Sequence, residues 1–100
     1  MIRAWLLDDE ELAVRRLRRM LEETGRVEIA GAATDPVEAV DQIRAARSDV
    51  LFLDIQMPVL TGFELLERLG EPQPLVIFTT AYHEYALQAF EVHSIDYLLK

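Results

Sequence analysis

Five short runs of apolar residues recur along the chain, and a polar or amphipathic stretch separates each run from the next. The runs have the length of strands rather than of helices. Apolar residues fill them almost continuously, which is typical of parallel strands that are buried on both faces of a sheet. The runs are residues 2–7, 27–33, 50–53, 75–79 and 95–99.

The stretches between these runs have the periodicity of helices. In the first stretch apolar residues recur every three or four positions, arginine and glutamate take the opposite, solvated face, and Gly25 ends the pattern. The next two helices begin at possible capping boxes, Asp35-Pro36-Val37-Glu38 and Thr61-Gly62-Phe63-Glu64, and a fourth helix is expected over residues 82–93. We expect the buried face of the first helix to consist of Ala13, Leu17, Met20 and Leu21.

Strands and helices therefore alternate along the whole chain, which predicts a doubly wound α/β domain with a parallel sheet and right-handed crossovers. The length of 100 residues suits one such domain, and 51% hydrophobic residues suffice for a core. The net charge of −8 argues against nucleic-acid binding by this domain. No apolar run is long enough to span a membrane, and the early acidic residues argue against a signal peptide. We expect a cytoplasmic domain.

Polar side chains follow four of the five predicted strands where those strands end. Because the carboxyl ends of parallel strands line one edge of the sheet, these side chains converge if the strands that carry them are neighbours. The residues are Asp8 and Asp9 at the end of the first strand, Asp54 at the end of the third, Thr79 and Thr80 at the end of the fourth, and Lys100 at the end of the fifth.

Three carboxylates at one edge of a sheet require a cation. Two of them about 4 Å apart repel by roughly 4 kcal/mol at an effective dielectric constant of about 20. Oxygen ligands without histidine or cysteine nearby favour Mg²⁺ or a similar hard ion such as Mn²⁺. A carboxylate beside such an ion can attack phosphorus, provided that an ammonium and a hydroxyl stabilise the phosphoryl oxygens. Lys100, the only lysine, suits the ammonium role.

This order of residues resembles the receiver domains of two-component response regulators, and the resemblance covers all 100 residues. Those domains carry an acidic pair after strand one, an acceptor aspartate after strand three, Ser or Thr after strand four and Lys after strand five. The stretches 85–92 and 95–100 further resemble receivers that precede LytTR-type (LytR/AlgR) DNA-binding domains. The matching motifs are Leu7-Asp8-Asp9-Glu10, Leu53-Asp54-Ile55-Gln56-Met57-Pro58-Val59-Leu60-Thr61-Gly62, Phe78-Thr79-Thr80-Ala81 and Asp96-Tyr97-Leu98-Leu99-Lys100.

The resemblance implies a flavodoxin-like receiver fold with strand order 2-1-3-4-5. It implies a phosphorylation-dependent switch that takes a phosphoryl group from a sensor histidine kinase and controls a C-terminal output domain, which we expect to bind DNA. Met57-Pro58 and Gly62 would shape the loop after the acceptor. The implied roles are Asp54 as acceptor, Asp8, Asp9, Asp54 and the Gln56 backbone carbonyl as Mg²⁺ or Mn²⁺ ligands, Thr80 as catalytic and switch hydroxyl, Tyr97 as switch aromatic, and Lys100 as catalytic ammonium.

The sequence departs from the family pattern at one place. In the family the lysine is followed by a proline and a fifth helix, whereas this sequence stops at Lys100. We therefore expect residues 1–100 to be a receiver domain that is incomplete at its C-terminus and lacks the last helix. The apolar face beside the first helix would then be uncovered, and we expect two copies to pair as a homodimer.

Two other functions fit parts of the pattern. A phosphatase of the haloacid dehalogenase type also uses aspartate and Mg²⁺, but it needs an Asp-x-Asp motif, and Asp8-Asp9 lacks that spacing. A receiver-like interaction module that is never phosphorylated would not need the complete set of acids, threonine and lysine. We therefore expect a regulatory phosphoacceptor domain and not an enzyme. Thr79 is expected to be a strand residue and Thr61 a helix cap.

Overall fold

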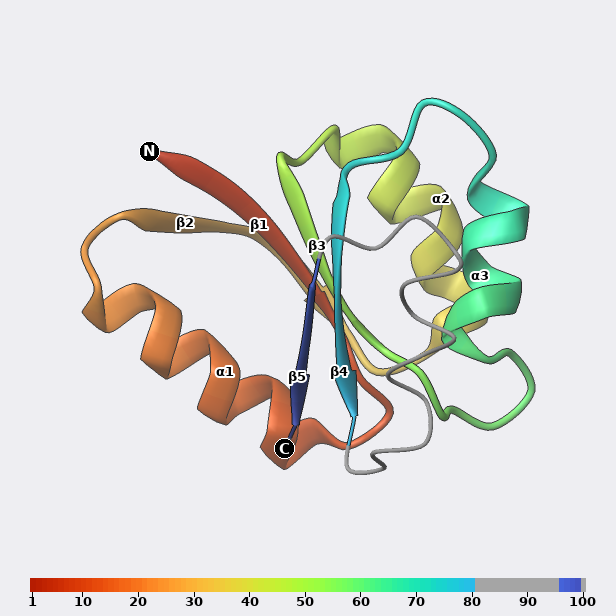
Figure 1. Cartoon of the computed structure of the whole chain (residues 1–100), viewed down its shortest axis with the longest axis horizontal. Coiled ribbons are helices and arrows are strands. Elements are labelled where there is room, and N and C mark those ends of the chain that lie inside the picture. The colour runs from red at the N-terminus through yellow and green to blue at the C-terminus, as the bar shows by residue number, and fades with distance from the viewer. Residues whose placement is uncertain (81–95, 100) are drawn as a thin grey trace.

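The computed structural model describes residues 1–80 and 96–99, with Thr80 and residues 96–99 described by their backbone alone. It is an α/β domain in which helices cover both faces of one sheet (Figure 1). The elements are β1 (Ile2–Leu7), α1 (Glu11–Glu23), β2 (Val27–Ala33), α2 (Pro36–Ala46), β3 (Val50–Asp54), α3 (Gly62–Leu69), β4 (Leu75–Thr80) and β5 (Asp96–Leu99). The helix expected over residues 82–93 lies outside the described residues.

The sheet has five parallel strands in the order β2-β1-β3-β4-β5, as the resemblance implied. The register pairs Leu7 at the end of β1 with Leu53 on β3, and it pairs Asp54 with Thr79 on β4. The carboxyl ends of β1, β3 and β4 therefore lie at the same edge of the sheet, where the sequence predicts the site.

The larger part of the core lies between the sheet and helices α2 and α3. Its side chains come from alternate positions of the central strands, because successive residues of a strand point to opposite faces. Phe63 at the start of α3 packs on Phe78 of β4, with ring centroids 5.1 Å apart. Burial of each large apolar side chain stabilises the fold by about 1.5–3 kcal/mol, so this face contributes most of the hydrophobic stabilisation.

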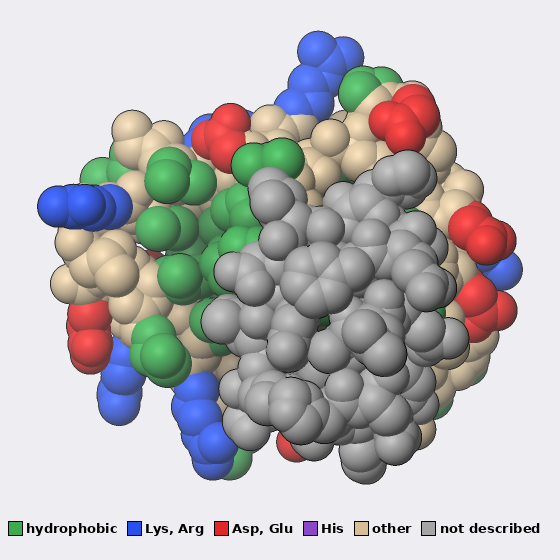
Figure 2. All heavy atoms as spheres, viewed as in Figure 1, with side chains coloured by type: hydrophobic (Ala, Val, Ile, Leu, Met, Phe, Trp, Pro, Cys, Tyr) green, Lys and Arg blue, Asp and Glu red, His purple; other side chains and the backbone are tan. Residues whose placement is uncertain are grey.

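The other face of the sheet is covered by α1 over only part of its area. Figure 2 shows hydrophobic side chains gathered over α1 and the neighbouring strands. Within α1, all of which is described, Val14 is the one buried residue, and Leu17 and Leu21 are partly buried beside it. The prediction that Met20 faces the core was wrong, since 63% of its surface is exposed. The stripe of α1 that contacts the sheet is formed by Val14, Leu17 and Leu21.

Helices α2 and α3 begin at the two predicted caps. At α3 the Glu64 N–H donates to the Thr61 hydroxyl (3.2 Å), and the Thr61 N–H donates to the Glu64 carboxylate (2.9 Å), which completes a capping box. These bonds from Thr61 hold the pKa of the Glu64 carboxyl below its ordinary value of 4.5. At α2 the Asp35 carboxylate accepts a hydrogen bond from the Val37 N–H (2.9 Å). In a capping box the donor would be the Glu38 N–H, so Asp35 caps this helix without the predicted box. Among the described residues, no helix is long and apolar enough to cross a bilayer.

Candidate functional site

Three consecutive acids follow β1 and form one end of the site. Asp8, Asp9 and Glu10 each place one carboxylate oxygen within 4.8 Å of those of the other two. Asp8 is buried, whereas Asp9 and Glu10 are exposed. A set of hard oxygen donors, open to solvent on one side, fits a Mg²⁺ ion that keeps several of its waters. Glu10 was not among the residues predicted for the site, although the run of three acids in the sequence was a signal for it.

Backbone hydrogen bonds position the first of these acids. The Asp8 N–H donates to the Ala33 carbonyl at the end of β2 (3.3 Å), which continues the sheet by one residue. The Asp8 carboxylate accepts a bond from the Glu10 N–H (2.9 Å), immediately before α1 begins. The N-terminus of α1 favours negative charge at this position. Asp8 therefore has a structural role in the turn from β1 into α1 as well as a position suited to metal binding.

Asp54 ends β3, the strand next to β1, and only 4% of its surface is exposed. Ile55, the next residue, is fixed by two backbone hydrogen bonds. The Ile55 N–H donates to the Thr79 carbonyl on β4 (3.3 Å), and the Gly62 N–H donates to the Ile55 carbonyl (2.8 Å). A Cβ atom on Gly62 would lie 2.6 Å from the Asp54 carbonyl oxygen. Glycine is thus needed at this position, which agrees with the prediction that Gly62 shapes the loop.

The loop between β3 and α3 is anchored by two buried side chains, Met57 and Leu60. The side chain of Gln56 is exposed. The role expected of the Gln56 backbone carbonyl stays a prediction.

The structure describes about half of the predicted site. It places Asp8 and Asp9 together and sets Asp54 at the end of the neighbouring strand, and Thr79 is a buried strand residue as expected. The backbone of Thr80 ends β4, and Tyr97 lies on β5. The side chains of Thr80 and Tyr97, and all of Lys100, lie outside the described part of the chain, so their roles stay predictions.

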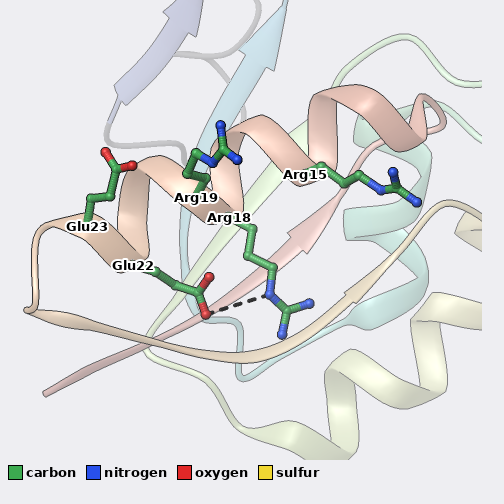
Figure 3. Close-up of a pocket in the computed structure, with 5 residues that line it drawn as sticks. All are labelled: Arg15, Arg18, Arg19, Glu22 and Glu23. Carbon is green, nitrogen blue, oxygen red and sulfur yellow. Dashed lines mark ion pairs between the residues drawn. The ribbon is translucent and has the colours of Figure 1, made fainter.

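The arginine-rich surface of α1 is a separate feature. A shallow hollow of about 380 Å³ there is lined by charged side chains that reach toward solvent (Figure 3). Arg18 pairs with Glu22 at 3.8 Å, and Arg15 pairs with Glu11 at 2.8 Å. Exposed pairs of this kind stabilise a helix by a few tenths of a kcal/mol, about 0.3–0.5. The surface therefore behaves as the solvated helix face that the sequence predicts.

Comparison with known proteins identifies the family. The model of the response regulator receiver domain matches residues 4–100, and the chain belongs to that family. It is 48% identical over 101 residues to an uncharacterized response regulatory protein of Vibrio cholerae, covering all of this chain and 43% of the relative. It is 46% identical to the transcriptional regulatory protein BtsR of Escherichia coli, covering all of this chain and 42% of BtsR. The chain thus spans less than half the length of these relatives.

Solved structures agree with the fold. The response regulatory domain of mrkE from Klebsiella pneumoniae is 31% identical with a TM-score of 0.87, over 99% of this chain and 83% of that one. The response regulator domain of Thermotoga maritima CheB is 26% identical with a TM-score of 0.88, over all of this chain and 78% of that one. The predicted receiver fold is therefore confirmed.

Proposed function

We propose that this chain is the phosphorylation-dependent switch of a two-component system, in which Asp54 accepts a phosphoryl group from a sensor histidine kinase. The observation that carries the proposal is a buried carboxylate at the end of β3, on the strand next to an acidic cluster that follows β1. A nucleophile beside a cation site is the arrangement that phosphoryl transfer to a carboxylate requires. Membership of the receiver family supports the same reading.

In the proposed reaction a carboxylate oxygen of Asp54 attacks phosphorus, and the bond between phosphorus and the histidine nitrogen breaks. Asp8, Asp9, Asp54 and the Gln56 carbonyl would hold Mg²⁺ or Mn²⁺, whose charge when bound neutralises the phosphoryl oxygens. The Thr80 hydroxyl and the Lys100 ammonium would donate hydrogen bonds to the same oxygens. The phosphoryl group thus moves from nitrogen to oxygen, and the histidine is released unphosphorylated.

The signal would then pass through the strands beyond the acceptor. Thr80 ends β4 and Tyr97 lies on the adjacent β5, so a change at the phosphoryl group can shift a two-state equilibrium at that end of the sheet. The relatives are more than twice as long as this chain, and one is named a transcriptional regulatory protein. We therefore infer a C-terminal DNA-binding output domain of the LytTR type in the whole protein, which would act in the cytoplasm.

The direct experiment is chemical phosphorylation. In the full-length protein, incubation with acetyl phosphate and Mg²⁺ is expected to add one phosphoryl group, and intact-mass analysis measures it. Because an acyl phosphate is formed, hydroxylamine should remove the group. A chain that stays unlabelled while a known receiver is labelled in the same buffer would contradict the proposal.

Metal binding should be measurable without any phosphodonor. Mg²⁺ is expected to raise the melting temperature, because the ion binds the folded acidic cluster and not the unfolded chain; at a hundred times the dissociation constant the stabilisation is about 2.7 kcal/mol. Asp9→Ala should abolish the response, and it should stabilise the metal-free chain by removing repulsion. Glu38→Ala, which removes an exposed carboxylate on α2, is the control. A normal Mg²⁺ response in Asp9→Ala would exclude Asp9 as a ligand.

We further propose that two copies pair through the apolar face beside α1. Leu75 at the start of β4 is 57% exposed and shares its sheet face with Ile77, which packs in the cluster under α1. Leu75→Glu is expected to weaken self-association at micromolar concentration, as measured by sedimentation velocity. Val37→Glu, a matched change of a half-exposed valine on α2, should leave it unchanged. A monomer at every concentration in the unchanged chain would rule out this pairing.

A further inference from the structure

A hollow of about 440 Å³ lies at the edge of the sheet opposite Asp54. It is bounded by the ends of α2 and α3 and by the segment that leads from α3 into β4, at the top of Figure 1. Its apolar walls come from Ile43, Leu69, Pro72 and Pro74. Sites for small molecules usually have volumes of about 300–1,000 Å³ and mostly apolar walls, so this hollow has the size and the lining of such a site.

Two side-chain hydrogen bonds hold the walls of the hollow in place. The Arg44 guanidinium, near the end of α2, donates to the Arg68 carbonyl near the end of α3 (2.8 Å). The Gln73 amide donates to the Leu66 carbonyl (2.8 Å) and so fixes the segment before β4 on the same helix. A hollow that is formed before its ligand arrives binds that ligand with little loss of conformational entropy in the protein.

Ser48 lines the hollow and carries a hydroxyl that the domain itself does not satisfy. Only 8% of the surface of Ser48 is exposed. Among the described residues, its Oγ is the one buried side-chain oxygen or nitrogen without a hydrogen-bond partner. An unsatisfied buried hydroxyl destabilises a fold, and such groups nearly always have a partner. A ligand in the hollow can supply that partner, because a serine hydroxyl is reoriented by rotation about a single bond.

The charge of the hollow comes from the end of α2. Arg44 and Arg47 line it together with one acid, Glu71, so the hollow is net positive in a domain whose net charge is −8. Arg44 pairs with Asp41 at 3.4 Å, whereas Arg47 makes no ion pair within the described part of the chain. Arg47 also holds the left-handed conformation that ends α2, with a φ angle of +48°, where glycine would be less strained.

We propose that this hollow binds a small organic acid. Its apolar body would pack against Leu69 and the two prolines, and its carboxylate would accept hydrogen bonds from the Arg47 guanidinium and the Ser48 hydroxyl. A guanidinium binds a carboxylate through two parallel hydrogen bonds, which selects a planar anion over a neutral group. Ser48 and Asp54 lie at opposite ends of β3, so binding in the hollow does not require phosphorylation of Asp54.

The test is a saturation-transfer NMR titration of the full-length protein with 4-phenylbutyrate as the probe. The comparison compound is 4-phenylbutan-1-ol, which has the same ring and chain but no charge. The acid is expected to bind with a dissociation constant on the order of 1 mM, as suits a ligand of this size. The alcohol should bind about tenfold more weakly, because it loses the charge-assisted hydrogen bonds.

Two variants place the probe in the hollow. Arg47→Gly removes the guanidinium and is compatible with the left-handed conformation, so the protein should stay folded while its affinity for the acid falls about tenfold. Ser48→Ala should also weaken binding by about tenfold, yet leave the melting temperature of the free protein unchanged or higher, because an unsatisfied buried hydroxyl is removed. Arg16→Ala, which removes an exposed arginine on α1, is the matched control and should bind the acid normally.

Three results would overturn the proposal. One is the absence of saturable binding at about ten times the expected dissociation constant. Another is equal binding of the acid and the alcohol, which would show that the hollow recognises only the apolar body. The third is undiminished binding in both Arg47→Gly and Ser48→Ala, which would place the probe elsewhere on the protein.

Discussion

Gly31→Ala is expected to destabilise the domain by about 1–3 kcal/mol, the usual cost of overpacking a core. Gly31 lies opposite Trp5 in the register of β1 and β2, next to an irregularity of the pairing. A Cβ atom there would clash with the Trp5 indole nitrogen and lie 2.6 Å from the adjoining ring carbon. The ring is buried in the core between the sheet and α2, so it cannot swing into solvent to relieve the clash.

Urea unfolding followed by far-ultraviolet circular dichroism measures this loss, a probe that also serves variants without Trp5, the only tryptophan. Glu28→Ala changes an exposed side chain on the same strand and should shift stability by less than about 0.5 kcal/mol. In a double-mutant cycle, Trp5→Leu should reduce the cost of Gly31→Ala, because the clashing ring is gone. A Gly31→Ala chain as stable as the original would show that β2 can move away from Trp5.

The strands were predictable because burial on both faces leaves an almost continuous apolar run. The run over residues 50–53 and the acid after it correspond to β3, which ends at Asp54. The order of the strands was not contained in that pattern, since every buried strand looks alike in sequence. The strand order was instead implied by the resemblance to receivers. Because β1 pairs with β3, the acids that follow these two strands lie at the same edge of the sheet.

Other features could not be predicted because they depend on tertiary geometry. Helical periodicity defines an apolar stripe on α1, but the rotation of the helix on the sheet decides whether Val14 or Met20 is buried. The positive φ angle of Val59 could not be predicted either, because valine is among the residues least expected in that conformation. The sequence predicted that Gly62 shapes the loop. Only the structure shows that Gly62 lies too close to the Asp54 carbonyl for a side chain to fit.

Asp54→Asn is expected to abolish phosphorylation of the chain. Asparagine has nearly the same shape as aspartate, so the end of β3 should keep its structure. Its amide is a poor nucleophile and carries no charge, so the attack on phosphorus is lost, together with the contribution of this side chain to cation binding. The loss should be complete rather than partial. The acids that follow β1 cannot replace Asp54 as acceptor, because they do not lie at the end of β3.

The most direct measurement is therefore the intact mass of three versions of the full-length protein after identical treatment with acetyl phosphate and Mg²⁺. The unchanged chain and Asp41→Asn, which alters a highly exposed aspartate on α2, should each gain one phosphoryl group. Asp54→Asn should gain none while showing the same far-ultraviolet circular dichroism spectrum. Full labelling of a folded Asp54→Asn chain would contradict the assignment of Asp54 as the phosphoacceptor.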